Sequence, residues 1–180
     1  RLKDKEITRL PMYRRARLGL GYLPQEPSVF RKLTVEDNLT AVLQFQPLSA
    51  EEQKKRRVEV LEKMGLTSLA SQIAGTLSGG ERRKVEIARS LVLNPAYLLL
   101  DEPFSGIDPI TIEDIRGIIR NLARSGIGIL ITDHNVRETL SITDRSYLVF
   151  QGKILISGSG PELVNNPEAR RFYLGETFTL

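Results

Sequence analysis

Stretches in which apolar residues recur every three or four positions alternate along the chain with short, continuous apolar runs. Helical spacing marks residues 34–45, 49–65, 78–94 and 111–124. The first three of these stretches begin at residues that commonly cap helices: Thr34, Ser49 and Ser78. We therefore expect four amphipathic helices in these places.

Continuous apolar runs are typical of strands that are buried on both faces of a parallel sheet. They occupy residues 96–100 and 126–131, and a shorter run at 18–23 stops before Pro24. Further along, residues 145–158 contain two strand-like runs joined at Gly152-Lys153, which predicts a hairpin. Helical pieces on either side of Pro167 close the chain.

This alternation of strands and helices predicts an α/β protein with a parallel-sheet core, a C-terminal β-hairpin and C-terminal helices. Residues 27–93 are almost purely helical, so we expect a helical subdomain there within a domain that spans residues 1–180. Residues 94–180 would then form the α/β core and the C-terminal region.

The stretch LSGGE places two glycines at the start of the third predicted helix. Ser78 and Glu81 have the spacing of a capping box, in which each side chain binds the other residue's backbone. The exposed N–H groups of such a helix start also attract anions, and Gly79 and Gly80 would let a phosphate approach closely. A simple cap and a cap that also binds phosphate both fit this pattern.

Acidic and polar residues follow the two buried runs directly. Asp101 and Glu102 come after the first run, and Asp133 and His134 come after the second. The carboxyl ends of parallel strands form one edge of a sheet, where ligands bind in open α/β folds. Paired carboxylates at this edge suit a magnesium-phosphate site, although Asp-Glu-Pro is also an ordinary turn sequence.

Composition excludes several classes of protein. The 180 residues contain no cysteine, hence no disulfide framework, and no apolar run approaches the roughly 18 residues of a membrane span. Residues 1–17 hold seven Lys or Arg and two acids, while the rest of the chain holds 19 basic and 20 acidic residues. This local basic excess contains one aromatic residue, so we expect no nucleic-acid partner, and a cytoplasmic location is the default.

Taken together and in order, these motifs resemble the nucleotide-binding domain of the ATP-binding cassette (ABC) ATPases. The motifs are Gln25 in LPQE, the signature LSGGE, YLLLDEP, SGIDP and ITDH. The resemblance extends over essentially the whole chain and implies a P-loop-NTPase-like fold. It also implies an ATPase that uses ATP and Mg²⁺.

In this family two domains face each other head to tail with ATP between them. The resemblance implies a homodimer in which the signature residues contact the γ-phosphate of ATP held mainly by the other subunit: Ser78, Gly79, Gly80 and Glu81. It also implies that Asp108 crosses the dimer interface and supports the opposite ATP site.

The catalytic roles implied by the resemblance fall on four residues. Asp101 would interact with Mg²⁺, and Gln25 would reach both Mg²⁺ and the hydrolytic water. Glu102 would act as the general base or orient that water, and His134 would sense the γ-phosphate.

A phosphate-binding loop of the form G-x-x-x-x-G-K-[ST] does not occur in the sequence. Gly152-Lys153, the only Gly-Lys pair, has Tyr147 five positions before the glycine and Ile154 after the lysine. We therefore expect residues 1–180 to be the C-terminal portion of a longer ABC domain, and to be inactive alone. A non-hydrolysing ABC-like scaffold is the alternative if no such loop exists upstream.

Within the family, the short separation of Gln25 and Ser78 favours transporters over relatives with a long inserted coiled coil. The segments SVFRKLTVEDNL, ITDHNVRETL and YLGETFTL resemble the ATPase subunits that power lipopolysaccharide extraction from the bacterial inner membrane. Branched-chain amino-acid importers share LSGGERR and are the alternative.

A transporter ATPase implies membrane partners. We expect the subunit to be cytoplasmic and peripheral on the inner membrane, beneath transmembrane permease subunits. Phe30 and Arg31 are the candidates for the docking groove, since aromatic and Arg side chains anchor many interfaces; a core or helix-staple role for Phe30 remains open. Residues 173–180 are a further candidate for the dimer contact.

Overall fold

A computed structural model describes residues 1–2, 4–175 and 178 of the chain. The chain divides into two compact units, Arg1–Thr132 and Asp133–Leu180, and each is described by itself. Four of the eight C-terminal residues considered for a dimer contact, at positions 176, 177, 179 and 180, lie outside the described residues.

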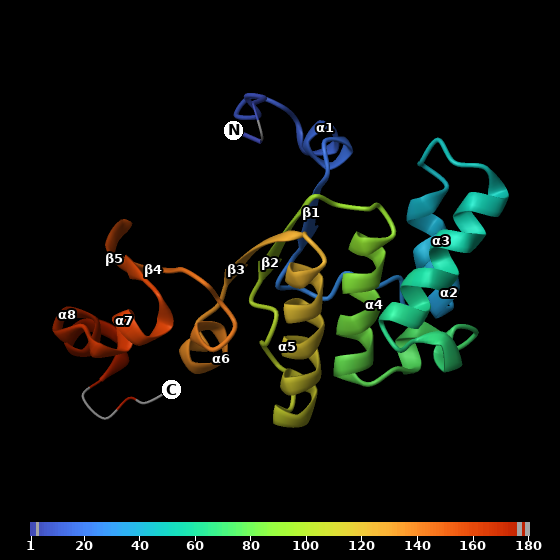
Figure 1. Ribbon diagram of the computed structural model, residues 1–180. Helices are drawn as coiled ribbons and strands as arrows, with labels where there is room; N and C mark the ends of the chain where they lie inside the picture. The colour runs from blue at the N-terminus through green and yellow to red at the C-terminus, as the bar shows by residue number, and fades with distance from the viewer. Residues whose placement is uncertain (3, 176–177, 179–180) are drawn as a thin grey trace. The chain divides into compact units, whose positions relative to one another are not determined.

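A parallel sheet forms the centre of the first unit (Figure 1). It consists of β1 (Leu20–Leu23), β2 (Tyr97–Asp101) and β3 (Gly128–Thr132), in the order β1-β2-β3. The register pairs Leu23 with Leu100 and Asp101 with Thr132. All three strands therefore end at one edge of the sheet, as the α/β prediction requires, and the predicted parallel core is confirmed.

Burial differs between the two faces of the sheet. Leu98 and Leu100, on one face of β2, are almost completely buried, whereas Tyr97 and Leu99 on the other face are not, so burial on both faces was predicted wrongly for β2 as well. Leu130 of β3 is 57% exposed. The prediction that residues 126–131 form a fully buried strand is therefore wrong for this strand, which lies at the edge of the described sheet.

The predicted helices of the first unit are all present. They are α2 (Val35–Leu43), α3 (Ala50–Lys63), α4 (Gly79–Leu91) and α5 (Pro109–Arg124). Two short 3₁₀ helices, Thr67–Leu69 and Ala74–Thr76, connect α3 to α4. The expected caps form as well, since Thr34, Ser49 and Ser78 each accept a hydrogen bond from the backbone three residues later.

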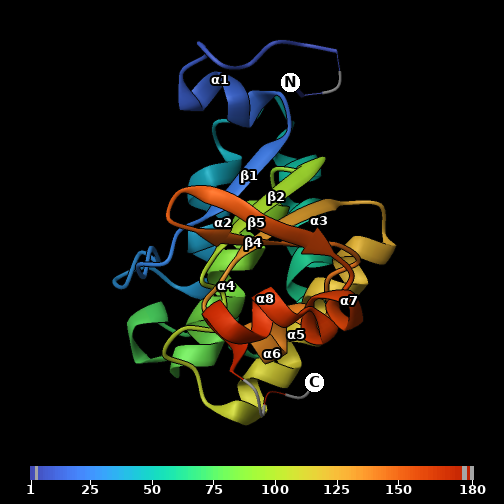
Figure 2. The ribbon, with the colours of Figure 1, turned by 90° about the vertical axis from the view of Figure 1, so that its left-hand side faces the viewer.

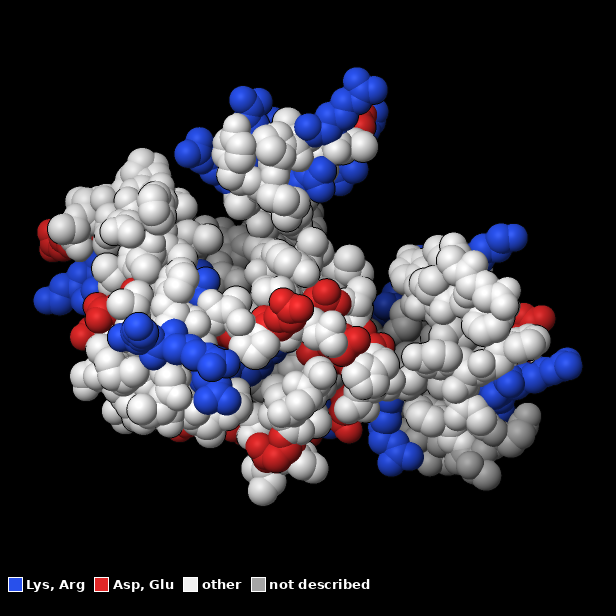
Figure 3. All heavy atoms as spheres, turned by 180° about the vertical axis from the view of Figure 1, so that it is seen from behind, with Lys and Arg blue, Asp and Glu red and all other residues white. Residues whose placement is uncertain are grey.

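A short helix near the N-terminus, α1 (Met12–Arg17), was not predicted. Its sequence MYRRAR has few apolar residues, so helical periodicity could not reveal it, and the helix contacts β1. The guanidinium groups of Arg14 and Arg17 lie 5.9 and 5.8 Å from the ring of Tyr13. Basic side chains also gather around the N-terminal segment, as the blue atoms at the top of Figure 3 show.

The second unit is a hairpin with helices packed on one side of it (Figures 1 and 2). The hairpin joins β4 (Ser146–Phe150) to β5 (Lys153–Gly158), and Gln151 and Gly152 have the positive φ angles of a tight turn. The predicted hairpin at Gly152-Lys153 is thus confirmed. The helical segments are α6 (Val136–Leu140), α7 (Gly160–Asn165), α8 (Pro167–Ala169) and a π-helical turn (Arg170–Leu174).

Helices α4 and α5 lie side by side in the first unit and begin at the same end, the end at which β2 stops (Figure 1). Gly80 of α4 faces Thr111 of α5 so closely that a Cβ on Gly80 would overlap the Thr111 methyl group. It would also lie 2.9 Å from Thr111 Oγ1. Gly80 is therefore required to bring the two helix starts together.

Replacing Gly80 by Ala should destabilise the complete protein by about 1–3 kcal/mol, the usual penalty for overpacking. Gly79→Ala is the matched control, because nothing lies within 4 Å of a Cβ at that position. Urea unfolding followed by circular dichroism measures both. Adding Thr111→Ser to Gly80→Ala should restore part of the lost stability, since it removes the overlapping methyl group. Equal stabilities for the Gly79→Ala and Gly80→Ala variants would contradict the packing argument.

Candidate functional site

The ends of β1 and β2 bring together two side chains that the sequence selected. Gln25 follows β1 by two residues, and Glu102 follows β2 directly. The Gln25 Nε2 amide donates a hydrogen bond of 2.8 Å to Glu102 Oε2. This contact joins residues 77 positions apart in the sequence and leaves the Gln25 carbonyl oxygen as an acceptor.

Asp101, the last residue of β2, is held by hydroxyl groups from both neighbouring strands. Thr132 Oγ1 donates to Asp101 Oδ1 at 2.7 Å, and the Tyr22 hydroxyl donates to Oδ2 at 3.3 Å. Partial burial and the nearby Asp101 carboxylate raise the pKa of Tyr22 above 10.0, so its hydroxyl stays protonated as a donor. The carboxylate is thus fixed in orientation at the sheet edge.

Glu102 has an unusual backbone conformation for a residue with a side chain. Its φ is +43°, and its N–H donates to the Thr132 carbonyl at 2.7 Å. Left-handed conformations of residues other than Gly, Asn and Asp are uncommon and occur often at functional sites. The β3 hydrogen bond therefore maintains a strained turn that holds Glu102 beside Gln25.

The start of α4 has both halves of the predicted capping box. The Ser78 N–H donates to Glu81 Oε2 at 2.8 Å, and Ser78 Oγ donates to the same oxygen at 2.7 Å. In return, Ser78 Oγ accepts the Glu81 N–H at 3.3 Å. The hydrogen bonds from Ser78 lower the pKa of Glu81 below its usual value, because they stabilise the charged carboxylate.

The start of α5 is capped in a similar way by Asp108. Its two carboxylate oxygens accept from the Thr111 N–H at 3.0 Å and the Thr111 hydroxyl at 2.6 Å. These bonds from Thr111 lower the pKa of Asp108 below 3.8. Since Thr111 also packs against Gly80, the starts of α4 and α5 lie in direct contact.

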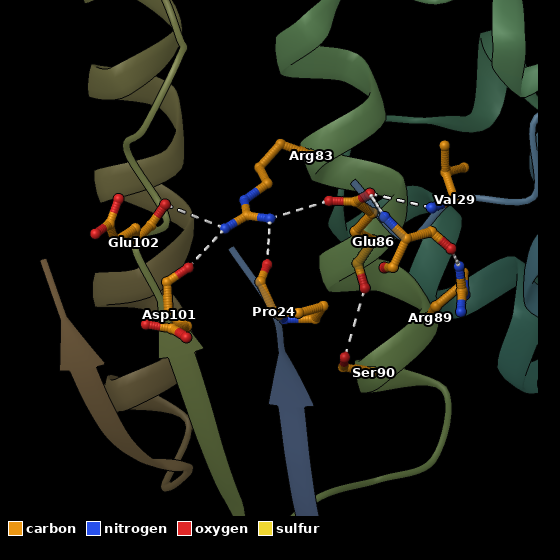
Figure 4. Close-up of polar contacts among 9 residues, drawn as sticks. Pro24, Val29, Arg83, Glu86, Arg89, Ser90, Asp101 and Glu102 are labelled. Carbon is orange, nitrogen blue, oxygen red and sulfur yellow. Dashed lines mark hydrogen bonds and ion pairs between the residues drawn. The ribbon is translucent and has the colours of Figure 1, made fainter. Parts of the chain in front are cut away.

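Arg83, in the second turn of α4, is a functional candidate that the sequence analysis missed (Figure 4). Only 6% of this residue is exposed. One terminal nitrogen donates to the Pro24 carbonyl at 2.9 Å, and the other donates to the carbonyls of Asp101 and Glu102 at 3.1 and 3.2 Å. A single guanidinium group therefore joins the ends of β1 and β2.

Glu86 forms a buried ion pair with Arg83 at 3.1 Å and is itself only 4% exposed. Its other carboxylate oxygen accepts the N–H groups of Ser28 and Val29 at 2.6 and 3.1 Å. In the structure both positions fall on the buried side of α4 with Ile87, which the polar sequence around them does not indicate. Two charges on the buried side of a helix indicate a site, but the sequence could not identify their partners.

Arg89 continues this polar row along α4. Its guanidinium group donates to the Ser28 carbonyl and lies 4.4 Å from the centre of the Phe30 ring. Burial lowers the pKa of Arg89, while the Glu86 carboxylate acts in the opposite direction. Phe30 itself remains 44% exposed, so one side of its ring is available to solvent.

A hollow of about 320 Å³ lies beside this row in the first unit. Helix α1 contributes Met12 and Tyr13, β1 contributes Tyr22, and α4 contributes Glu86 and Arg89. Its wall thus combines apolar surface with one buried ion-pair member and one Arg. Phe30 and Arg31, the residues predicted for a docking groove, do not line this hollow, although Phe30 packs against Arg89, which does.

His134 belongs to the second unit, so its predicted role next to Glu102 stays a prediction. The His134 side chain is 67% exposed, and its Nδ1 lies 3.8 Å from Asp133 Oδ1. The Asp133 side chain is fully buried and accepts the Asn135 N–H at 2.7 Å, as in a tight polar turn.

The side chains that could bind a metal ion are spread over the chain. Among residues 1–2, 4–175 and 178, no three His, Cys, Asp or Glu side chains are grouped as a complete protein-only metal site would need. Mg²⁺ in phosphate sites needs fewer protein ligands, since one or two carboxylates act together with substrate phosphates and water. The Asp101 carboxylate and the side-chain carbonyl oxygen of Gln25 are ligands of the kind that such a Mg²⁺ site uses.

Comparison with known proteins identifies the family. The sequence model described as ABC transporter matches residues 1–105. The lipopolysaccharide export system ATP-binding protein LptB of Acidithiobacillus ferridurans is 52% identical over 99% of this chain and 74% of its own length. LptB of Escherichia coli K12 is 51% identical over 99% of the chain and 75% of its own length.

Solved structures agree with the sequence relatives. MJ1267, an ATP-binding cassette of an ABC transporter in its ADP conformation, superposes with a TM-score of 0.83 at 29% identity. The match covers 97% of this chain and 75% of that one. The predicted family and fold are both confirmed, and the chain belongs to the ATP-binding domains of the ABC transporter family.

Proposed function

We propose that this chain binds and hydrolyses ATP as a subunit of an ABC transporter that extracts lipopolysaccharide from the bacterial inner membrane. The observation that carries the proposal is the 2.8 Å contact between Gln25 and Glu102 beside Asp101, at the ends of parallel strands. The cargo rests on the two LptB relatives, at 52% and 51% identity over 99% of the chain. These relatives do not favour the branched-chain amino-acid alternative.

In hydrolysis, Glu102 orients the attacking water and accepts its proton as the water oxygen bonds to the γ-phosphorus. The bond from the γ-phosphorus to the bridging oxygen breaks in the same step, and ADP leaves with that oxygen. A carboxylate in hydrogen-bond reach of water serves this purpose, and the Gln25 amide fixes its direction. The Gln25 carbonyl oxygen is an acceptor for the same water. The left-handed turn at Glu102 holds the carboxylate ready before the substrate arrives.

Asp101 and Gln25 would hold Mg²⁺ at the sheet edge, directly or through water. When bound, Mg²⁺ neutralises charge on the phosphate oxygens and orients them. Thr132 and Tyr22 keep the Asp101 carboxylate in place for this role through their hydroxyl hydrogen bonds.

The start of α4 binds the γ-phosphate of an ATP molecule held mainly by a second subunit. Ser78, Gly79 and Gly80 present a capped helix start, whose dipole favours negative charge by about 0.3–1 kcal/mol at an exposed position. Glu81 keeps the Ser78 hydroxyl oriented, and Asp108 supports the opposite site across the homodimer. His134 senses the γ-phosphate.

The hollow beside Arg89 receives a helix from a transmembrane permease subunit. Its apolar walls suit an amphipathic helix, and the exposed edge of Phe30 with its Arg89 partner makes an anchor of the kind common at interfaces. Arg31, next to Phe30 in the sequence, stays a candidate contact. No helix in the described part of the chain is long and apolar enough to span a membrane. We infer a peripheral position on the cytoplasmic side of the inner membrane.

Glu102→Gln in the complete protein should lower the ATP hydrolysis rate by at least about a hundredfold, because the general base is lost. ATP binding should be retained, and the closed dimer should accumulate. Glu113→Gln is the matched control, an exposed carboxylate of α5 paired with Arg116. Hydrolysis by the Glu102 variant at the wild-type rate would remove this residue from catalysis and contradict the proposed function.

Phe30→Ala should weaken association with the permease subunits by about tenfold, or roughly 1.4 kcal/mol, as expected for a moderate interface anchor. Phe45→Ala is the control, since Phe45 is 78% exposed just after α2. Co-purification of the complete protein with the permease subunits, and surface plasmon resonance between the two, measure the effect. Equal binding by the two variants would place the docking surface elsewhere.

A further inference from the structure

The segment that carries Gln25 is fixed to α4 at both of its ends. At its beginning, the Pro24 carbonyl accepts from Arg83 at 2.9 Å. At its far end, the N–H groups of Ser28 and Val29 donate to Glu86 at 2.6 and 3.1 Å. Gln25 lies between these two attachments, so its position depends on the Arg83–Glu86 pair.

Glu102, the partner of Gln25, is attached to the same pair. Arg83 donates to the carbonyls of both Asp101 and Glu102, the two residues at which β2 ends. One guanidinium group thus contacts the backbone on both sides of the Gln25–Glu102 hydrogen bond. Figure 4 shows Arg83 between Pro24, Glu86 and the two acidic residues.

Burial makes this arrangement rigid. Arg83 and Glu86 are 6% and 4% exposed, so solvent screens their interaction little and neither side chain has room to adopt other rotamers. The planar guanidinium group also fixes the directions of its donors, which a Lys ammonium cannot do. The guanidinium group therefore fixes the carbonyls of Pro24, Asp101 and Glu102 relative to one another.

We propose that the buried Arg83–Glu86 pair is a positioning element for hydrolysis, which sets the alignment of Gln25 with Glu102 without contacting ATP. The inference rests on the proposed function, because it assigns the pair to the hydrolytic step of that site. A residue that only stabilises the fold would lower the amount of active protein. A positioning pair lowers the rate constant of each correctly folded molecule.

The test compares variants of the complete protein assembled with its membrane partners. Arg83→Met keeps an unbranched stem in the buried site and removes the guanidinium donors. We expect kcat for ATP hydrolysis, counted per bound nucleotide, to fall by about tenfold to a hundredfold, the effect of small misplacements at a site. KM for ATP should stay within about twofold, because binding groups are unchanged.

Two further variants separate positioning from folding. Arg83→Lys keeps the charge opposite Glu86 but not the fork of donors, so kcat should fall less than in Arg83→Met, with KM unchanged. The double variant Arg83→Met with Glu86→Gln should lose no more than Arg83→Met alone, because residues that act as one unit give non-additive losses. Should Arg83→Met fail to fold, the Lys variant alone decides the question.

Lys84→Met is the matched control on the next residue of α4. Lys84 forms a surface ion pair with Asp114 at 2.9 Å, and its loss should leave kcat unchanged, since such pairs contribute little. Wild-type kcat in Arg83→Lys, or additive losses in the double variant, would overturn the inference. If Glu102→Gln also hydrolyses ATP normally, the proposed function itself fails; if it does not, only the positioning role is refuted.

Discussion

The candidate site depends on one buried guanidinium group, that of Arg83, which attaches the ends of two strands to helix α4. Arg83 satisfies three backbone carbonyls that would otherwise be left without these donors at the ends of β1 and β2. Removing one member of a buried ion pair leaves an uncompensated charge, which destabilises proteins by roughly 3–5 kcal/mol. The same contact that stabilises this edge therefore also determines where Gln25 and Glu102 lie.

Helix α4 connects the different parts of the proposed site. Its first residue after the cap, Gly79, belongs to the phosphate-binding start, its second turn carries Arg83, and its later turns carry Glu86 and Arg89. Gly80, the residue after Gly79, faces the neighbouring α5, and Arg83 contacts the strand ends. Glu86 and Arg89 line the hollow, and Arg89 also packs against Phe30. A single helix thus links the proposed phosphate-binding start, the proposed catalytic edge and the proposed docking surface.

Much of this could be predicted from the sequence because the signals are local. Caps at Ser49 and Ser78 depend on residues three positions apart, and the hairpin turn depends on Gly152. The pairing of Gln25 with Glu102 was accessible only through the resemblance to ABC ATPases, since 77 positions separate them.

Other features depend on long-range packing that no local pattern records. Leu130 lies on the same face of the sheet as its partner Leu99, and periodicity does not determine how well that face is covered. Arg83 sits in a strongly polar stretch, so its burial depends on backbone carbonyls 59 and 18 positions away. Helix α1 lacks an apolar stripe and was missed for that reason.

A crystal structure of the complete protein with the Arg83→Met substitution tests the central claim most directly. The account predicts that the Gln25 Nε2 to Glu102 Oε2 hydrogen bond, 2.8 Å here, is lost while the Ser78–Glu81 capping box stays intact. A structure in which that hydrogen bond keeps its present length, with the carbonyls of Pro24 and Glu102 unmoved, would contradict it.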